Sequence, residues 1–206
     1  MKDPNRPTLT TRRGPRPRGV AGLLTLLLLG ASLGWPTAHA AEGPWRIGPG
    51  QVLLLRHALA PGTGDPPGFR LGDCSTQRNL DANGRRQARR LGDWLRERGV
   101  TRARVYSSQW CRCLETAKLL ELGPVTELPA LNSFFRRPQD QAPKISALET
   151  FLRDQPMDGD PLILVTHQVT ITALTGIYPR PGDGVLLNLV PGEAPRLLGP
   201  VPVPQD

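Results

Sequence analysis

The sequence has little of the residue types that build metal and thiol centres. Its 206 residues include only three cysteines and three histidines, and no Cys-x-x-Cys pair occurs. A structural zinc site needs four such ligands, so a zinc or thiol protein is a poor interpretation of this chain. Lysine is scarce as well, since only three of the 26 basic residues are lysines and the others are arginines.

A long apolar run is also missing. Residues 21–35 form an apolar run without a charge, which is shorter than the roughly 20 apolar residues that a membrane-spanning helix needs. A basic segment precedes it, and Pro36–Ala40 ends in an Ala-x-Ala pattern. Together these features predict a cleaved secretory signal peptide over residues 1–40, with an uncleaved anchor as the alternative. We expect a periplasmic or secreted protein without stable membrane insertion after cleavage.

Most of the positive charge belongs to this leader. The whole chain has a formal net charge of +8, but the first 20 residues hold six of the 26 basic residues and one of the 18 acidic ones. Residues 41–206 therefore carry a net charge of only +3. The charge gives no support for nucleic-acid binding. The length of residues 41–206 fits a single domain.

Export would place the three cysteines in an oxidising compartment, where one disulfide and one leftover thiol are expected. Cys111 and Cys113 lie two residues apart on a predicted helix and face different directions. A bridge from Cys74 to one or the other is therefore the prediction.

Short apolar runs alternate with helical patterns along the mature chain. Strands are predicted over residues 51–55, 104–107, 125–128, 161–166, 184–190 and 195–203, and helices over 84–98, 109–122, 142–153 and 168–177. This alternation predicts an α/β domain of three α/β/α layers around a mostly parallel sheet. Ligands of such sheets bind beyond the carboxyl ends of the strands.

Both histidines outside the leader stand at such strand ends. His57 follows the strand over 51–55, and His167 follows the strand over 161–166. Arg56 adjoins His57, and Arg112 lies on the first helical turn after the strand over 104–107. We expect these four side chains to form an anion pocket with no carboxylate close by, because guanidinium groups match phosphate oxygens bidentately.

Four segments, in order over residues 51–176, resemble motifs of the histidine phosphatase superfamily, which has the phosphoglycerate-mutase-like fold. These segments are Leu55–Ala58, Arg78–Ala88, Ser107–Ala117 and Val165–His167. The first resembles an Arg-His-Gly signature with alanine in the third position, and the last resembles the second-histidine motif.

The resemblance implies a phosphatase, a phosphoric monoester hydrolase of the histidine acid-phosphatase type that needs no metal or other cofactor, and the predicted signal peptide would make it an exported one. His57 would attack phosphorus as a neutral imidazole and form a phosphohistidine that water hydrolyses. Arg56, Arg112 and His167 would hold the oxygens of a small phosphorylated substrate. Thr63 would supply a phosphate contact where the family's usual threonine and asparagine are missing.

One departure from the family concerns the acid that protonates the leaving group. Where the family often carries a carboxylate, the stretch Leu131–Ser133 ends in serine. Glu127 and Asp140 are the nearest substitutes. We therefore expect a preference for good leaving groups, since general acid catalysis is worth about 10²–10⁴ in rate. The alternative is a catalytically weak member that binds phosphorylated ligands.

Three further features have simpler interpretations. Phe134–Arg137 follows the place of a substrate loop and is either substrate-facing or a core plug. Trp110 is predicted to be a packing residue. The arginines of the helix over 84–98 are predicted to form its solvated face.

Overall fold

The computed structural model describes residues 46–201 and 203. The predicted signal peptide over residues 1–40 lies outside the described residues and stays a prediction. Within the described part of the chain, no helix is both long enough and apolar enough to cross a membrane.

A six-stranded mixed sheet forms the centre of the domain. Its strands are β1 (Gln51–Arg56), β2 (Arg104–Ser107), β3 (Val125–Glu127), β4 (Leu162–Thr166), β5 (Gly184–Asn188) and β6 (Arg196–Val201). They lie in the order β3-β2-β4-β1-β5-β6. The first four are mutually parallel, whereas β5 and β6 pair antiparallel at one edge. The predicted mostly parallel sheet and the predicted closing strand pair are confirmed.

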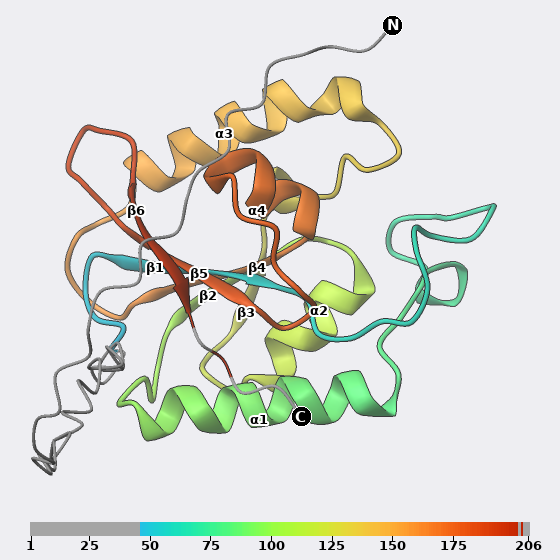
Figure 1. The fold of residues 1–206 in the computed structure, drawn as a ribbon, viewed down its shortest axis with the longest axis horizontal. Helices are drawn as coiled ribbons and strands as arrows, with labels where there is room; N and C mark the ends of the chain where they lie inside the picture. The colour runs from blue at the N-terminus through green and yellow to red at the C-terminus, as the bar shows by residue number, and fades with distance from the viewer. Residues whose placement is uncertain (1–45, 202, 204–206) are drawn as a thin grey trace, which may run out of the picture. The chain divides into compact units, whose positions relative to one another are not determined.

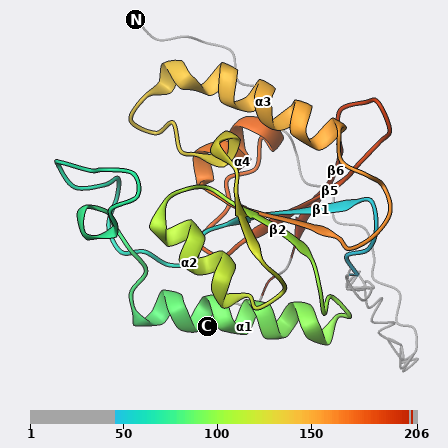
Figure 2. The ribbon, with the colours of Figure 1, turned by 180° about the vertical axis from the view of Figure 1, so that it is seen from behind.

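Four helices cover the two faces of the sheet (Figures 1 and 2). They are α1 (Ala82–Glu97), α2 (Cys111–Leu119), α3 (Gln141–Arg153) and α4 (Gln168–Thr175). α1 and α2 lie on one face, and α3 and α4 lie on the other. The predicted three layers are thus confirmed. Short 3-10 turns lie at η1 (Cys74–Thr76), η2 (Pro129–Leu131) and η3 (Pro138–Asp140).

Helix boundaries differ from the prediction at several ends, most clearly in α1 and α2. α1 begins two residues early because the Asp81 side chain caps it, accepting a hydrogen bond from the Gly84 amide at 2.7 Å. α2 was predicted over 109–122 but ends at Leu119. Glu121 adopts a left-handed φ of 55°, which a continuing helix does not allow.

The apolar runs of the central strands are continuous because both faces of the sheet are buried. Leu53 and Leu55 pack with α1 and α2, whereas Val52 and Leu54 pack with α3 and α4. Successive strand residues point to opposite faces, so a strand covered on both sides must be apolar throughout.

The chain just after β1 is held by both helices of one layer. The Ala58 amide donates to the Thr116 hydroxyl of α2 at 3.0 Å, and the Leu59 amide donates to the Gln87 side chain of α1 at 2.9 Å. Gly84 in the first turn of α1 lets the two backbones approach closely. These contacts fix the backbone that carries His57.

Replacing Gly84 by alanine should destabilise the domain. A Cβ there would lie 1.9 Å from the Leu59 carbonyl oxygen, and a backbone atom cannot give way as a flexible side chain does. We expect the free energy of unfolding to fall by about 1–3 kcal/mol in urea denaturation. Gly48→Ala is the matched control, because its Cβ would meet nothing within 4 Å. Equal unfolding free energies for the two variants would contradict this close approach.

A disulfide joins Cys74 of η1 to Cys111 of α2, across a sequence separation of 37. This resolves the two predicted pairings in favour of Cys111. Cys113 remains a free, buried thiol whose pKa is raised to about 12 by burial.

Removing this bridge should lower stability. The double variant Cys74→Ser, Cys111→Ser should lose about 2–4 kcal/mol of unfolding free energy, because its unfolded chain is no longer cross-linked. A reducing agent should shift the wild type to the same value and leave the variant unchanged. Non-reducing mass mapping should find a peptide pair linking Cys74 to Cys111. Detection of three free thiols would refute the bridge.

Candidate active site

Two histidines meet at the carboxyl ends of β1 and β4. Register pairs Arg56 with Thr166, so His57 and His167 come next on neighbouring parallel strands. Their ring centroids lie 5.5 Å apart, and both residues are buried. The structure therefore brings together the two imidazoles that the sequence placed at strand ends.

His57 carries its ring proton on Nδ1. That nitrogen lies 2.8 Å from the Ala58 carbonyl oxygen, which can only accept. The other nitrogen, Nε2, accepts a hydrogen bond of 3.2 Å from Arg112 Nε and has its lone pair directed into the site. Burial, and then the charge of Arg112, hold the pKa of His57 well below its ordinary value of 6.5. His57 is therefore neutral and nucleophilic at Nε2 around neutral pH.

His167 has the opposite tautomer. Its Nδ1 faces Arg112 Nη2 at 3.5 Å and must accept, since a guanidinium only donates. Its Nε2 then donates to the Ser108 hydroxyl at 2.9 Å, which donates to Asn132 Oδ1 at 3.1 Å. Burial, Arg112 and then His57 hold the pKa of His167 well below 6.5. The chain through Ser108 to Asn132 orients this ring.

Two arginines bring positive charge to the histidines. Arg112, on the first turn of α2, is buried and contacts both rings. Arg56 donates through Nη1 to the Pro179 carbonyl at 2.8 Å. Its Nε is buried without a hydrogen-bond partner, one of three such side-chain atoms in the described part of the chain. An unused buried donor in a cationic cavity favours an anionic ligand.

The prediction that no carboxylate lies close to these groups is wrong. Asp65, on the loop after β1, forms an ion pair with Arg112 at 2.7 Å, and both side chains are less than a tenth exposed. Its carboxylate also accepts from the indole nitrogen of Trp110 at 3.1 Å. Asp65 was missed because its loop has no periodicity and its partner lies 47 residues further along the chain.

Trp110 is more than the predicted packing residue. Besides its bond to Asp65, it stacks on Phe69 with ring centroids 5.0 Å apart, and both rings line the cavity. Its ring meets that of His167 edge-on at 5.3 Å. Trp110 therefore forms part of the wall of the site.

A third arginine, Arg78, also lines the cavity. Its guanidinium donates to the Gly64 carbonyl at 2.7 Å and to the Ala60 carbonyl, holding the loop after β1. Burial, and then the charge of Arg112, lower its pKa to about 10. The sequence signal was present, since Arg78 opens the second of the matched segments, but the role of that segment was not assigned.

The cavity around these groups has a volume of about 450 Å³ and is larger than one phosphoryl group needs. Thr63 lines it from the exposed loop, as do Ser133, Phe135, Arg136 and Arg137. Phe134 instead is buried. Phe134–Arg137 therefore combines both predicted roles, with one side chain in the core and three on the cavity.

The two predicted substitutes for the missing acid lie in different places. Asp140 lines the cavity but forms an ion pair with Arg137 at 3.1 Å. Glu127 does not line the cavity and accepts a hydrogen bond from Gln109 at 3.0 Å. Ser133 lines the cavity and accepts from the Phe135 amide at 3.2 Å.

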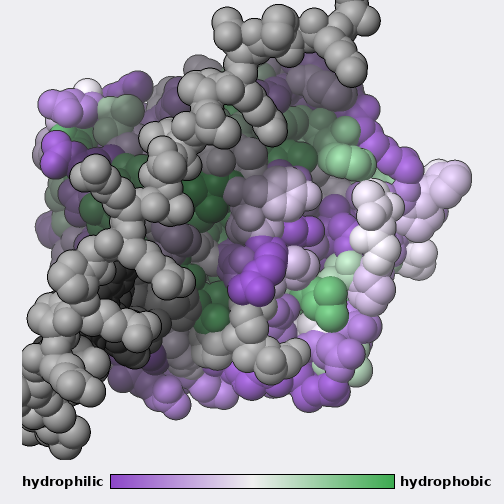
Figure 3. Space-filling view, in the orientation of Figure 1, coloured by the Kyte–Doolittle hydropathy of each residue, from purple (hydrophilic) through white to green (hydrophobic). Residues whose placement is uncertain are grey.

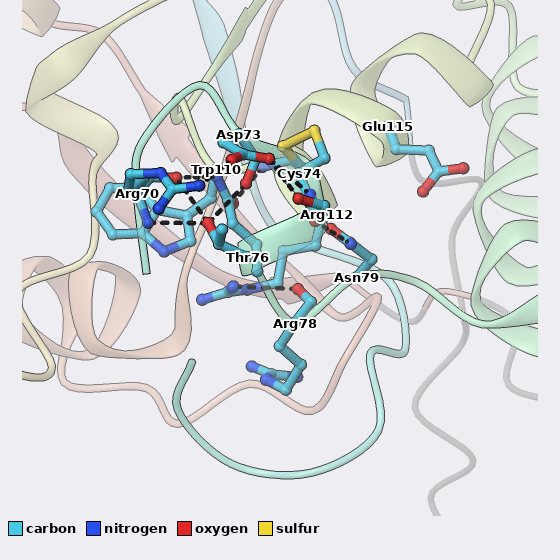
Figure 4. Close-up of a disulfide and its surroundings, with 12 residues drawn as sticks. Arg70, Asp73, Cys74, Thr76, Arg78, Asn79, Trp110, Arg112 and Glu115 are labelled. Atoms are coloured by element: carbon cyan, nitrogen blue, oxygen red, sulfur yellow. Dashed lines mark hydrogen bonds and ion pairs between the residues drawn. A yellow bond between two sulfur atoms is a disulfide. The ribbon is translucent and has the colours of Figure 1, made fainter. Parts of the chain in front are cut away.

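The disulfide joins η1, which lies shortly before Arg78, to α2, the helix that carries Arg112 (Figure 4). Next to the bridge, the Cys111 amide donates to the Gln77 side chain at 3.0 Å, and Arg112 Nη1 donates to the Arg78 carbonyl at 3.3 Å. Both contacts lie at the start of α2. The bridge therefore keeps the segment that carries Arg78 close to the start of α2, which carries Arg112.

The arrangement places a neutral nucleophile among three arginines. It can bind an oxyanion and attack an electrophilic centre bound to it, while the arginines stabilise the negative charge that develops. Over residues 46–201 and 203, no cluster of three or more His, Cys, Asp or Glu side chains could hold a metal ion.

Comparison with known proteins agrees with this geometry. The model of the histidine phosphatase superfamily (branch 1) matches residues 52–135. No curated protein matches the sequence.

Several solved structures share the fold. SixA from Agrobacterium tumefaciens is 20% identical with a TM-score of 0.52, over 74% of this chain and 97% of that one. A protein histidine phosphatase SixA complexed with tungstate is 17% identical with a TM-score of 0.51, over 73% and 96%. A mycobacterial glucosyl-3-phosphoglycerate phosphatase complexed with VO3 is 15% identical with a TM-score of 0.54, over 73% and 97%. Identities this low show the fold alone. Together with the family match over residues 52–135, which include Arg56, His57 and Arg112, they agree with the resemblance of this chain to the histidine phosphatase superfamily.

Proposed function

We propose that this protein is an exported phosphatase that needs no metal and works through a phosphohistidine on His57. One observation carries the proposal. The unprotonated Nε2 of a neutral, buried imidazole accepts only from Arg112 Nε and borders a cavity that arginines line. The match to the family model supports the same chemistry.

In the first step, a phosphoryl group enters between the arginines and His57. Nε2 of His57 forms a bond to phosphorus, and the bond from phosphorus to the leaving oxygen or nitrogen breaks. Arg56 contributes its unused Nε donor and Arg112 donates to the phosphoryl oxygens. His167 also donates to them once the entering anion favours a proton on its Nδ1. The Nδ1 proton stays on the ring, hydrogen-bonded to the Ala58 carbonyl oxygen, which stabilises the positive charge on the phosphorylated ring.

In the second step, water attacks phosphorus on the side opposite His57. The bond between phosphorus and Nε2 breaks, which returns the neutral imidazole and releases inorganic phosphate. The arginines supply positive charge throughout both steps, so the mechanism itself calls for no metal ion.

The substrate would be a small phosphorylated compound with a good leaving group, such as an aryl phosphate, acyl phosphate or phosphoramidate. The serine at position 133 supports this preference, because it cannot supply a strong acid. Two proteins of similar fold are described with the oxyanions tungstate and VO3, which is consistent with a phosphoryl site. A weakly catalytic protein that binds phosphorylated ligands is the alternative, and the same Ser133 favours it.

Export to the periplasm or outside the cell is part of the proposal. The leader pattern over residues 1–40 supports it, and so does a disulfide, which persists in oxidising compartments.

His57→Ala should abolish turnover without unfolding the protein. Hydrolysis of 4-nitrophenyl phosphate with EDTA present should fall at least about 10³-fold, because the nucleophile is gone. Arg112→Ala should keep measurable turnover, and far-UV circular dichroism should show both variants folded.

A His57→Ala variant with full activity would eliminate the phosphohistidine route. Loss of wild-type turnover in EDTA would contradict metal independence. A wild type that binds orthophosphate but turns over no substrate would favour the ligand-binding alternative.

Activity should persist at pH values below the ordinary histidine pKa. Because the pKa of His57 is held well below 6.5, its neutral form should remain dominant as the pH falls through that value. The logarithm of kcat/KM, corrected for ionisation of the substrate, should therefore stay level from about pH 8 to below pH 6.5. An acidic limb centred at or above pH 6.5 would show that His57 is not shielded from protonation.

A further inference from the structure

Asp65 contacts the Arg112 guanidinium at two points inside the cavity. Its Oδ1 accepts from Nη1 at 2.7 Å and its Oδ2 accepts from Nη2 at 3.4 Å, a two-pronged contact of the kind a phosphoryl group makes. Oδ2 also accepts from Trp110, and Oδ1 accepts from the Arg78 amide at 3.2 Å. The carboxylate is thus held from three directions inside the cavity.

Every part of the Arg112 guanidinium is engaged. Besides Asp65, it contacts His57 through Nε, His167 through Nη2 and the Arg78 carbonyl through Nη1. A phosphoryl group must therefore displace one of these partners to reach Arg112. Asp65 is the only anion among these partners. If the phosphoryl group replaces Asp65, Arg112 exchanges one anionic partner for another. If it replaced a neutral partner, two anions would lie beside the same arginine and repel each other.

The loop that carries Asp65 can shift without breaking a helix or a strand. Residues 57–73 contain neither, and Gly62, Gly64, Gly68 and Gly72 all have positive φ angles. This segment projects from the domain in Figures 1 and 2, and it has the pale colours of intermediate hydropathy in Figure 3. Across the cavity mouth, Arg136 donates to the Asp65 carbonyl oxygen.

Two carboxylates, Asp65 and Asp140, line the cavity among the residues that the structure describes. Of the carboxylates among the described cavity residues, Asp140 is paired with Arg137, which leaves Asp65. Burial alone would raise the pKa of Asp65, but hydrogen bonds and charge from Arg112, with help from Trp110 and Arg78, hold it below its ordinary value of 3.8. Once Asp65 leaves Arg112, it loses the interactions that lower its pKa, and the nearby phosphoryl anion raises that pKa and favours the protonated form.

We propose that Asp65 is the catalytic acid of this enzyme: the entering phosphoryl group displaces it from Arg112, and its carboxyl group then protonates the leaving oxygen. Asp65 takes up the proton of the entering monoanionic phosphoryl group as it leaves the ion pair. It gives that proton to the leaving oxygen as the bond to phosphorus breaks and His57 Nε2 bonds to phosphorus. The resulting carboxylate then accepts a proton from the attacking water in the second step. This inference rests on the proposed phosphatase function, and with Asp65 as the acid the substrate need not have a good leaving group.

The test compares two substrates that differ in their need for an acid. Phenyl phosphate has a poor leaving group, whereas 4-nitrophenyl phosphate releases a much more acidic phenol. Asp65→Asn keeps the shape and the acceptor oxygen of the side chain but removes the proton donor. Asp93→Asn, an exposed residue paired with Arg96 on α1, controls for the loss of a carboxylate elsewhere. Asp140→Asn tests the rival cavity carboxylate.

For Asp65→Asn, kcat on phenyl phosphate should fall about 10²-fold or more, and kcat on 4-nitrophenyl phosphate should change less than about tenfold. Orthophosphate, measured by calorimetry, should bind several-fold more tightly, because a competing anion has been removed. Asp93→Asn should match the wild type in all three measurements.

Equal losses on both substrates, or weaker orthophosphate binding, would show that Asp65 only positions Arg112 and would overturn the proposal. A substrate-selective loss in Asp140→Asn instead would assign the acid to Asp140. If the wild type hydrolyses neither substrate, the proposed phosphatase function itself fails. That outcome differs from an active wild type whose Asp65→Asn variant shows no substrate selectivity.

Discussion

The parallel pairing of β1 with β4 is the contact on which the rest of the site depends. It continues one residue past the strands, where the His57 amide donates to the Thr166 carbonyl at 3.0 Å. β2 extends the same edge, since the Ser108 amide donates to the Val165 carbonyl at 2.9 Å. The carboxyl ends of β1, β2 and β4 therefore lie side by side at the same edge of the sheet. The two imidazoles and the helix carrying Arg112 are brought together by backbone hydrogen bonds rather than by contacts of their own.

Burial gives these groups their chemistry. An imidazole in a dry, cationic environment loses its affinity for a proton, which is why both histidines stay neutral beside Arg112. The same environment makes an unpaired guanidinium costly. Asp65 offsets the charge of Arg112, while Arg56 and Arg78 leave the cavity with a positive excess. Such a cavity stabilises a phosphoryl anion and the charge that develops during its transfer.

The loop that carries Asp65 is anchored at both ends. At its start, Ala58 and Leu59 are hydrogen-bonded to α2 and α1, and at its end Cys74 is covalently joined to Cys111. Between them the loop is held through side chains, chiefly those of Arg78 and Asp65. These anchors hold His57 and Arg112 in place. The loop between them can therefore move Asp65 away from Arg112 without disturbing the histidines.

The sequence by itself determined the strands, most helix positions and the location of both histidines and Arg112, because each follows from local apolar periodicity and from the strand or helix beside it. Its motifs also indicated the family. Only the tertiary structure decided that Cys74 pairs with Cys111 rather than Cys113, and that Trp110 lines the cavity. It also decided that the carboxylate beside Arg112 is that of Asp65 and not that of Glu127 or Asp140. These contacts join residues of irregular loops to distant helices, and no periodic pattern encodes where such a loop folds back. Its course follows from the anchors, the glycine conformations and the buried charge that it meets.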